Sequence, residues 1–247
     1  MDAVTLGNLL LEYCNTLKIP VEYLMDILID QKVVPMIRGK ATEYSTYLLL
    51  KETLNPHEWS VAKLNLNAQT STHDEDVTIT HQRTGIIIKV ECKNAVRDSF
   101  KYSSRARFSH EPFCSIKCHK SRSDLSKAAT TNDRYLVGDF DIIVSNLSNA
   151  VIAGATYSEN FELKDDSRLI EKLSEHYGCG TSYNDIFEAT YNDWRFAIAE
   201  DIAENGVIPR TPKVLLQNDK HWHPIAELEQ YLSVFVREHK DRMKKRR

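Results

Sequence analysis

Two runs of β-branched residues around a short turn are the feature that most constrains the fold. The segment from Asp76 to Lys93 reads DVTITHQRTGIIIKVECK, and residues 82–85 separate its two runs. Valine, isoleucine and threonine favour strands, and a short polar turn ending in glycine joins antiparallel strands. The pattern therefore predicts an antiparallel hairpin. Its second strand, 86–90, is nearly all apolar, which is typical of a central strand covered on both faces.

The hairpin is expected to bring three charged side chains together. If the turn is centred within 82–85, the ladder places Asp76 opposite Glu91. Side chains alternate along a strand, so Glu91 and Lys93 share one face and Cys92 points to the other. Two adjacent carboxylates repel each other, and a divalent cation relieves the repulsion. Carboxylate, water and phosphate oxygens suit Mg²⁺, so we expect Asp76 and Glu91 to bind Mg²⁺ with Lys93 beside it.

These residues resemble the motif of the PD-(D/E)XK nuclease superfamily, which includes type II restriction endonucleases and archaeal junction resolvases. The resemblance rests on Asp76 and on Glu91-Cys92-Lys93, which follows the apolar strand. In that superfamily the Asp and Glu bind metal and the Lys assists catalysis, which implies these roles for Asp76, Glu91 and Lys93. The resemblance covers residues 39 to 146 and implies a restriction-endonuclease-like fold.

The resemblance extends to an acidic residue upstream. Glu43 follows Gly39 on a predicted helix, which is similar to a Gly and Glu signature of the superfamily and implies a catalytic role. The alternative is a first-turn acid that only favours the helix dipole. One departure is Glu75, which stands before Asp76 where the motif has proline; that position is loose in the superfamily.

Other acidic residues leave alternatives open. Asp74 competes with Asp76 for the metal, and Asp76 is preferred because it directly precedes the strand. Asp139 and Asp141 either support the site or end a strand in solvent. The hairpin acids and lysine themselves have a non-catalytic interpretation, namely a solvated face with Glu and Lys two residues apart.

The remaining patterns predict an α/β fold. We expect a mixed central β-sheet of at least four strands flanked by helices, with helical additions at both ends. Residues 1–38 form a helical appendage in this interpretation, and residues 39–247 form the nuclease domain. The helices are expected at 5–17, after Pro20, from Gly39 to Asn55, and through most of the chain from Asp165 onward, including 167–177, 184–206 and 226–247; the further strands are expected at 59–66 and 135–147.

A basic insertion at 95–134 is the expected DNA-binding surface. The formal net charge of the chain is -3, so any contact with DNA must be local rather than spread over the protein. Arginine and lysine bind phosphates, and arginine also pairs with guanine edges. A solvated basic loop is the alternative. The predicted DNA contacts are Arg97, Lys101, Arg105, Arg107, Lys117, Lys120 and Arg122.

The five cysteines are odd in number and irregularly spaced, which favours free thiols in a reducing compartment. Cys114, Cys118 and His119 form a weak zinc pattern. Cys92 would be its fourth ligand but is better explained as an inward residue of the catalytic strand. No long apolar run or secretory leader pattern is evident, so we expect no membrane contact and a prokaryotic cytoplasmic location.

The leading functional hypothesis is a type II restriction endonuclease that hydrolyses double-stranded DNA with Mg²⁺. Two-fold symmetric targets would imply a homodimer. A structure-selective nuclease of the junction resolvase or repair type shares the chemistry and remains an alternative. So does a catalytically silent DNA-binding protein on the same scaffold. A helix-turn-helix reader in the first two helices is a further possibility, although most helix pairs are packing units.

Overall fold

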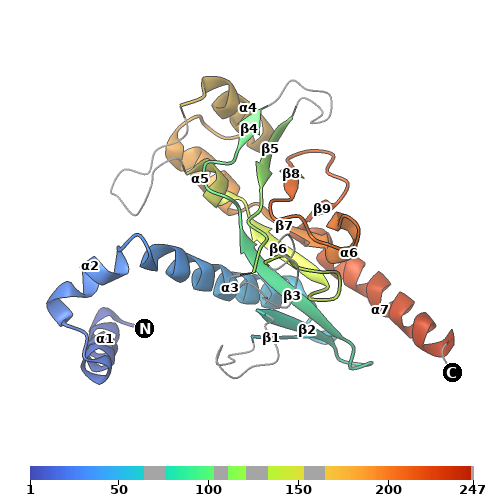
Figure 1. The fold of residues 1–247 in the computed structure, drawn as a ribbon, viewed down its shortest axis with the longest axis horizontal. Coiled ribbons are helices and arrows are strands. Elements are labelled where there is room, and N and C mark those ends of the chain that lie inside the picture. Colours follow the sequence, from blue (N-terminus) through green and yellow to red (C-terminus); the bar gives the residue numbers. More distant parts are fainter. Residues whose placement is uncertain (64–75, 103–110, 121–132, 153–164, 246–247) are drawn as a thin grey trace.

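The fold is that of a computed structural model, which describes residues 1–63, 76–102, 111–120, 133–152 and 165–245 (Figure 1). Its centre is a six-stranded mixed sheet in the order β1-β2-β3-β6-β7-β9. β3 and β6 are parallel, whereas the other neighbouring strands are antiparallel. The predicted α/β class with a mixed sheet is confirmed. The strands are β1 (Trp59–Ala62), β2 (Val77–His81), β3 (Ile87–Asn94), β6 (Ile142–Asn146), β7 (Trp194–Ile198) and β9 (Trp222–Pro224).

The hairpin of β2 and β3 has the predicted register. Val77 pairs with Val90 and Ile79 pairs with Ile88. The turn is closed by the N–H of Gly85, which donates to the carbonyl oxygen of His81 at 2.9 Å. Gly85 has φ 68°, a left-handed conformation that glycine adopts without steric penalty. Local pattern and turn chemistry were therefore enough to specify this part of the sheet.

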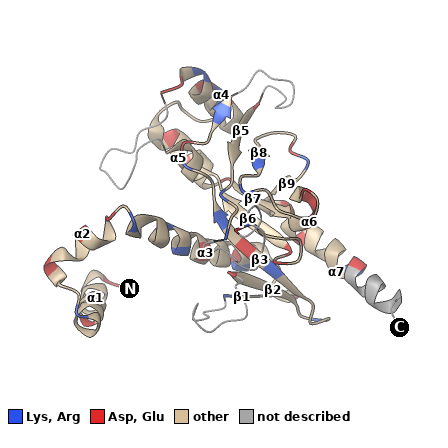
Figure 2. Cartoon of the chain, in the orientation of Figure 1, with Lys and Arg blue, Asp and Glu red and all other residues tan. Residues whose placement is uncertain are grey.

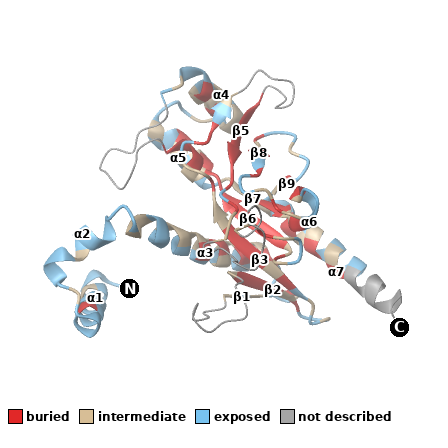
Figure 3. Cartoon of the chain, viewed as in Figure 1, coloured by how far each residue is buried: buried red, intermediate tan, exposed pale blue. Residues whose placement is uncertain are grey.

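Helices cover both faces of the central sheet. On one face, α3 (Val33–Thr53) and α7 (Leu228–Lys245) contribute Leu50 and Leu232 to a buried cluster with Ile79 and Val90. On the other face, a second cluster includes residues of α4 (Ser167–Tyr177), α5 (Tyr183–Tyr191) and α6 (Ala199–Ile202). Figure 3 shows the buried residues concentrated in the sheet between these layers.

A second, three-stranded sheet joins distant parts of the chain. It contains β4 (Lys101–Tyr102), β5 (Pro112–Ser115) and β8 (Lys213–Leu215) in that order. Every residue of β5 is buried, and Cys114 and Ile116 pack in the second cluster. The described part of the predicted basic insertion is therefore not a solvated loop, because a short apolar run between its charged residues forms a core strand.

The N-terminal helices form an arm that lies apart from the sheet (Figures 1 and 3). It consists of α1 (Ala3–Leu17), the 3-10 turn Val21–Tyr23 and α2 (Leu24–Leu28). Large apolar side chains are exposed on it, including Leu6, Tyr13 and Met25 at 49%, 55% and 59%. These two helices were expected to pack together, yet most of their apolar surface faces outward in the single chain.

Two predicted element boundaries are wrong. Helix α3 begins at Val33 rather than at Gly39, because Pro35 occupies its first turn, where N–H groups have no acceptor within the helix. The predicted division at residue 38 therefore falls inside α3. The strand expected at 135–147 is regular only in β6, since Gly138 has φ 100° and the N–H of Asp139 closes a turn onto Leu136.

The C-terminal part contains strands that the sequence did not predict. The helix expected at 184–206 ends at Tyr191, and Trp194–Ile198 forms β7, which pairs with β6. Strands β8 and β9 follow in a region where helical patterns were expected to dominate. The helices at 167–177 and in the last part of the chain are confirmed. The remaining short elements are the 3-10 turns Ser148–Val151 and Ile225–Glu227.

Candidate active site

The hairpin positions the three residues of the predicted catalytic centre. Asp76 directly precedes β2, and its Oδ2 accepts a hydrogen bond from the backbone N–H of Cys92 at 2.8 Å. Glu91 and Lys93 lie on β3, while Cys92 between them packs into the cluster on the α3 and α7 face. Asp76, Glu91 and Lys93 are thus brought together at one end of the hairpin. Figure 2 shows acidic and basic residues side by side along β3.

Glu91 has two partners inside the protein. Its Oε1 lies 2.5 Å from Nζ of Lys93 and accepts a hydrogen bond from the hydroxyl of Tyr135 at 2.6 Å. A buried carboxylate needs such donors because loss of water penalises its charge. Tyr135 was not predicted, because it reaches Glu91 from the turn before β6 and no local pattern marks that contact.

Two ammonium groups lie over the ring of Tyr135. Nζ of Lys93 is 5.1 Å from the centroid of its ring, and Nζ of Lys120 is 5.3 Å from it. Lys120 in turn forms an ion pair with Asp139 at 2.8 Å. Such cation-π contacts hold positive charge over an aromatic face. Lys120, predicted as a DNA contact, therefore lies beside the residues predicted to be catalytic.

The ammonium group of Lys93 is stabilised in its charged form. Burial by itself lowers the pKa of Lys93, but the charges of and hydrogen bonds to Glu91 and Tyr135 together outweigh burial, and the pKa is raised above its ordinary value. Burial and the charge of Glu91 likewise raise the pKa of Tyr135. At neutral pH the site therefore holds a protonated lysine and a neutral tyrosine around Glu91.

Among the three carboxylates described at this site, Asp76 has the least compensated charge. Its pKa is raised from 3.8 to about 7, chiefly by burial and then by the negative charges of Glu91 and, more weakly, Glu43. The N–H of Cys92 and the charge of Lys93 act in the opposite direction without cancelling these effects. Near neutral pH the carboxylate of Asp76 is therefore held at an energetic cost that a bound cation would relieve.

Glu43 lies on α3 and faces the same region. It is buried, and its carboxylate lies 2.7 Å from Nζ of Lys40 and 2.5 Å from Nζ of Lys63. Lys63, at the end of β1, was not predicted as part of the site. Because α3 begins at Val33 and Glu43 is buried between two cations, Glu43 is not a first-turn acid in solvent; its charge also raises the pKa of Asp76, more weakly than that of Glu91.

The donor set is compatible with Mg²⁺ bound by few protein ligands. Within the described residues, no group of three or more histidine, cysteine, aspartate or glutamate side chains is placed to hold a metal ion. Mg²⁺ commonly takes only one or two carboxylates and keeps several waters. Asp76 and Glu91 supply two carboxylates, and the raised pKa of Asp76 marks missing positive charge. The competing Asp74 lies outside the described residues.

The two aspartates near β6 have structural contacts. Oδ2 of Asp139 accepts a hydrogen bond from the N–H of Leu136 at 2.9 Å, in addition to its ion pair with Lys120. Oδ2 of Asp141 accepts one from the N–H of Lys89 at 2.8 Å. These contacts favour the interpretation that Asp139 and Asp141 support the turn that carries Tyr135.

The predicted DNA contacts are only partly described. Arg97 is half-buried, whereas Lys101 and Lys117 are exposed and Lys120 lies in the site. Arg105, Arg107 and Arg122 lie outside the described residues. The cysteines of the weak zinc pattern, Cys114 and Cys118, are buried, and burial raises the pKa of Cys118 to about 12.

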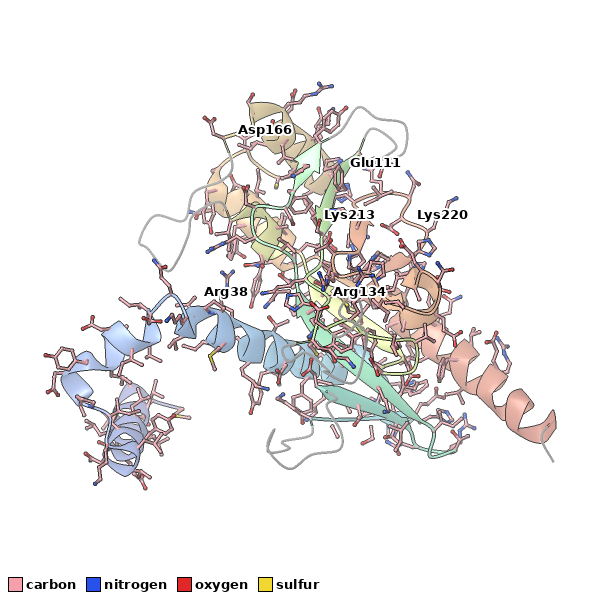
Figure 4. The ribbon with its side chains drawn as sticks, in the orientation of Figure 1. Arg38, Glu111, Arg134, Asp166, Lys213 and Lys220 are labelled. Atoms are coloured by element: carbon pink, nitrogen blue, oxygen red, sulfur yellow. The ribbon has the colours of Figure 1, made fainter. Side chains whose placement is uncertain are left out.

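Two further arginines near the site were not predicted. Arg38 of α3 hydrogen-bonds to Asn149, and burial followed by the positive charge of Arg97 lowers its pKa. Arg134 precedes Tyr135, and its buried Nε has no hydrogen-bond partner within the described residues. Figure 4 shows Arg38 on α3 and Arg134 over the middle of the molecule.

Comparison of the chain with protein families, with curated proteins and with solved structures finds no match. A separate search of the described helices finds none with the length and apolarity needed to cross a membrane.

Proposed function

We propose that this chain is a Mg²⁺-dependent deoxyribonuclease of the type II restriction endonuclease kind. The observation that carries the proposal is the cluster of Asp76, Glu91 and Lys93 at one end of a hairpin. Tyr135 and Lys93 hold Glu91, while Asp76 lacks compensating charge. A scissile phosphodiester is a substrate whose reaction needs this combination of metal-binding carboxylates and a fixed cation.

The chain's own residues have distinct roles in the proposed reaction. Hydrolysis forms a bond between a water oxygen and phosphorus and breaks the bond from phosphorus to the leaving oxygen; the attacking water loses a proton to solvent and the leaving oxygen takes one up. Bound Mg²⁺ would supply a Lewis acid that neutralises charge on the phosphate. Asp76 and Glu91 would hold the ion. Lys93 would stabilise the negative charge that develops on the phosphate, since its raised pKa suits a permanent cation better than a base.

The direct test is incubation of the purified full chain with plasmid DNA and Mg²⁺. Discrete bands are expected, because a sequence-reading enzyme cuts at fixed positions. Asp76→Ala, Glu91→Ala and Lys93→Ala should each abolish cleavage while Ca²⁺-supported DNA binding is largely kept. Glu52→Ala, an exposed acid of α3, is the matched control and should cleave normally.

Three other outcomes of the cleavage experiment would lead to different conclusions. Cleavage confined to branched or damaged DNA would favour a structure-selective nuclease. DNA binding without cleavage in Mg²⁺ or Mn²⁺ would favour a silent DNA-binding protein. Full activity in any of the three catalytic variants would refute the assignment of the site.

The proposal includes a homodimer on duplex DNA. It is supported by the exposed apolar residues of the arm, among them Leu6, Leu9 and Tyr13, since contiguous apolar surface of this kind marks interaction sites. Light scattering should give a molecular mass twice that of one chain, and Leu9→Asp should reduce this mass to that of a single chain. Glu12→Gln on the same helix is the control. A monomer for the unchanged protein would contradict this part of the proposal.

A further inference from the structure

A cavity of about 490 Å³ lies between the turn before β6, helix α6 and helix α7. Its volume falls in the range of small-molecule binding sites, roughly 300 to 1,000 Å³. None of the residues proposed to act on DNA lines it. The turn supplies Phe140, the end of β7 supplies Ile198, and α7 supplies Tyr231 and Val234.

The floor of this cavity is apolar and aromatic. Its larger apolar side chains come from three separate elements, so the concavity is a product of the fold rather than of one helix. Val234 remains 37% exposed although neighbouring residues of α7, Leu232 and Val236, are buried. The apolar part of the lining consists mainly of Val137, Phe140, Ile198, Tyr231, Val234 and Phe235.

The polar part of the lining is acidic. Asp141 comes from the segment just before β6, Glu200 and Asp201 from α6, Glu227 from the turn that leads into α7, and Glu238 from α7 itself. The described lining residues include no lysine, arginine or histidine. Five acidic residues from four segments therefore surround an apolar floor, and the mutual repulsion of their carboxylates favours an occupant with positive charge.

The carboxylates converge on the aromatic part of the floor. The pKa of Tyr231 is raised by burial and then by the negative charges of Glu227 and Asp201, which reach its hydroxyl from two elements. The hydroxyl also lies 3.1 Å from Nδ1 of His223. The same His223 nitrogen is 3.8 Å from Glu227. Negative potential and an aromatic face therefore meet at Tyr231, the arrangement that attracts organic cations.

We propose that this cavity, the acidic pocket, binds a small organic cation with an aromatic or branched aliphatic body. The body would cover the apolar floor, and the ammonium or guanidinium group would lie among the carboxylates of α6 and α7. An inorganic cation would leave the floor exposed to water, and an anion of the same shape would be repelled. Charge and shape together thus define the class of ligand.

The test measures the heat of binding of tryptamine to the full chain in EDTA by titration calorimetry. Indole-3-propionate, an anion with the same indole ring, is the control ligand. Saturable tryptamine binding tighter than about 1 mM is expected, with no measurable heat from the anion. Putrescine, which has the charge without an apolar body, should bind more weakly than tryptamine. EDTA removes divalent metals that would compete for the carboxylates.

Two sets of variants locate the binding. Glu200→Gln combined with Asp201→Asn keeps side-chain size and should weaken tryptamine binding about tenfold. Glu12→Gln with Glu22→Gln removes the same charge from the arm and should leave the affinity unchanged. Val234→Trp fills the cavity from an exposed position and should abolish binding even if the double variant proves unstable. No saturable binding of tryptamine, equal binding of the anion, or unchanged affinity in the filled variant would overturn the proposal.

Discussion

Replacing Asp76 with asparagine is expected to stabilise the fold at pH 8 while removing the proposed activity. The pKa of Asp76 is raised to about 7 by burial and by the charges of Glu91 and Glu43. Between the ordinary pKa of 3.8 and about 7, the folded protein keeps a proton that the unfolded chain has already lost. Stability therefore falls as pH rises through this window, because the folded state binds more protons.

The size of the effect follows from the two pKa values. A rise in the pKa of Asp76 from 3.8 to about 7 destabilises the folded protein by about 4 kcal/mol once the pH exceeds both values. Near pH 4 the destabilisation is almost zero. Asparagine retains an oxygen that can accept the hydrogen bond from Cys92. We therefore expect Asp76→Asn to raise the free energy of unfolding by about 2 to 4 kcal/mol at pH 8 and by less than about 0.5 kcal/mol at pH 4.

Urea unfolding in EDTA at both pH values measures the difference between the variant and the unchanged protein. Glu52→Gln, the exposed counterpart on α3, should change stability by less than about 0.5 kcal/mol at either pH. Added Mg²⁺ should stabilise the unchanged protein but not Asp76→Asn, since only the former has the proposed carboxylate ligand. If Asp76→Asn gains the same stability at both pH values, or loses stability at pH 8, burial of the Asp76 charge does not destabilise the folded protein.

Three further outcomes are expected. Tyr135→Phe removes a hydrogen-bond donor to Glu91, so the free energy of unfolding in urea should fall by about 1 to 3 kcal/mol and plasmid cleavage should slow about tenfold. If both quantities stay unchanged, the contact between Tyr135 and Glu91 is unimportant. Cleavage at limiting Mg²⁺ should fall about tenfold per pH unit below pH 7, because Asp76 must be ionised to bind metal, whereas a flat profile from pH 5 to 8 would contradict this role. Gly85 has φ 68°, so Gly85→Ala should lower the free energy of unfolding in urea by about 1 kcal/mol. Gly7→Ala, within α1, should leave the free energy of unfolding unchanged or raise it. Equal effects of the two substitutions would contradict the turn geometry.

The hairpin was predictable because its information is local. A turn of four residues, two β-branched runs and an alternating pattern fixed which residues face each other, and the observed pairs Val77 with Val90 and Ile79 with Ile88 follow. The geometry around Asp76 and Glu91 came from that register. Their chemical roles remain predictions for the cleavage experiments.

Strand β7 was not predictable in the same way. Its sequence, WRFAI, follows a helix directly and precedes the short helix α6, so the local pattern is compatible with one continuous helix. What makes it a strand is pairing with β6 on one side and β9 on the other. Such pairing depends on residues far away in the sequence, and tertiary context overrides local propensity in short apolar segments.

The same limit applies to the residues that surround the proposed catalytic centre. Tyr135, Lys120 and Lys63 reach it from three segments that are separate from the hairpin in sequence. Their residue types are common in turns and at strand ends, so no spacing distinguishes them. Only the packing of the turn before β6 against β3 gives Tyr135 its contact with Glu91.

The distribution of these partners indicates where a cation would be bound. Glu91 has Lys93 beside it, and Glu43 has both Lys40 and Lys63. Within the described residues, no lysine or arginine forms an ion pair with Asp76, whose raised pKa reports the missing charge. A positive charge brought by a ligand would therefore stabilise this site most when it lies next to Asp76. A metal held there would lie within reach of Glu91 and the Lys93 ammonium, so the same imbalance that destabilises the free protein would contribute directly to binding the ion and the phosphate.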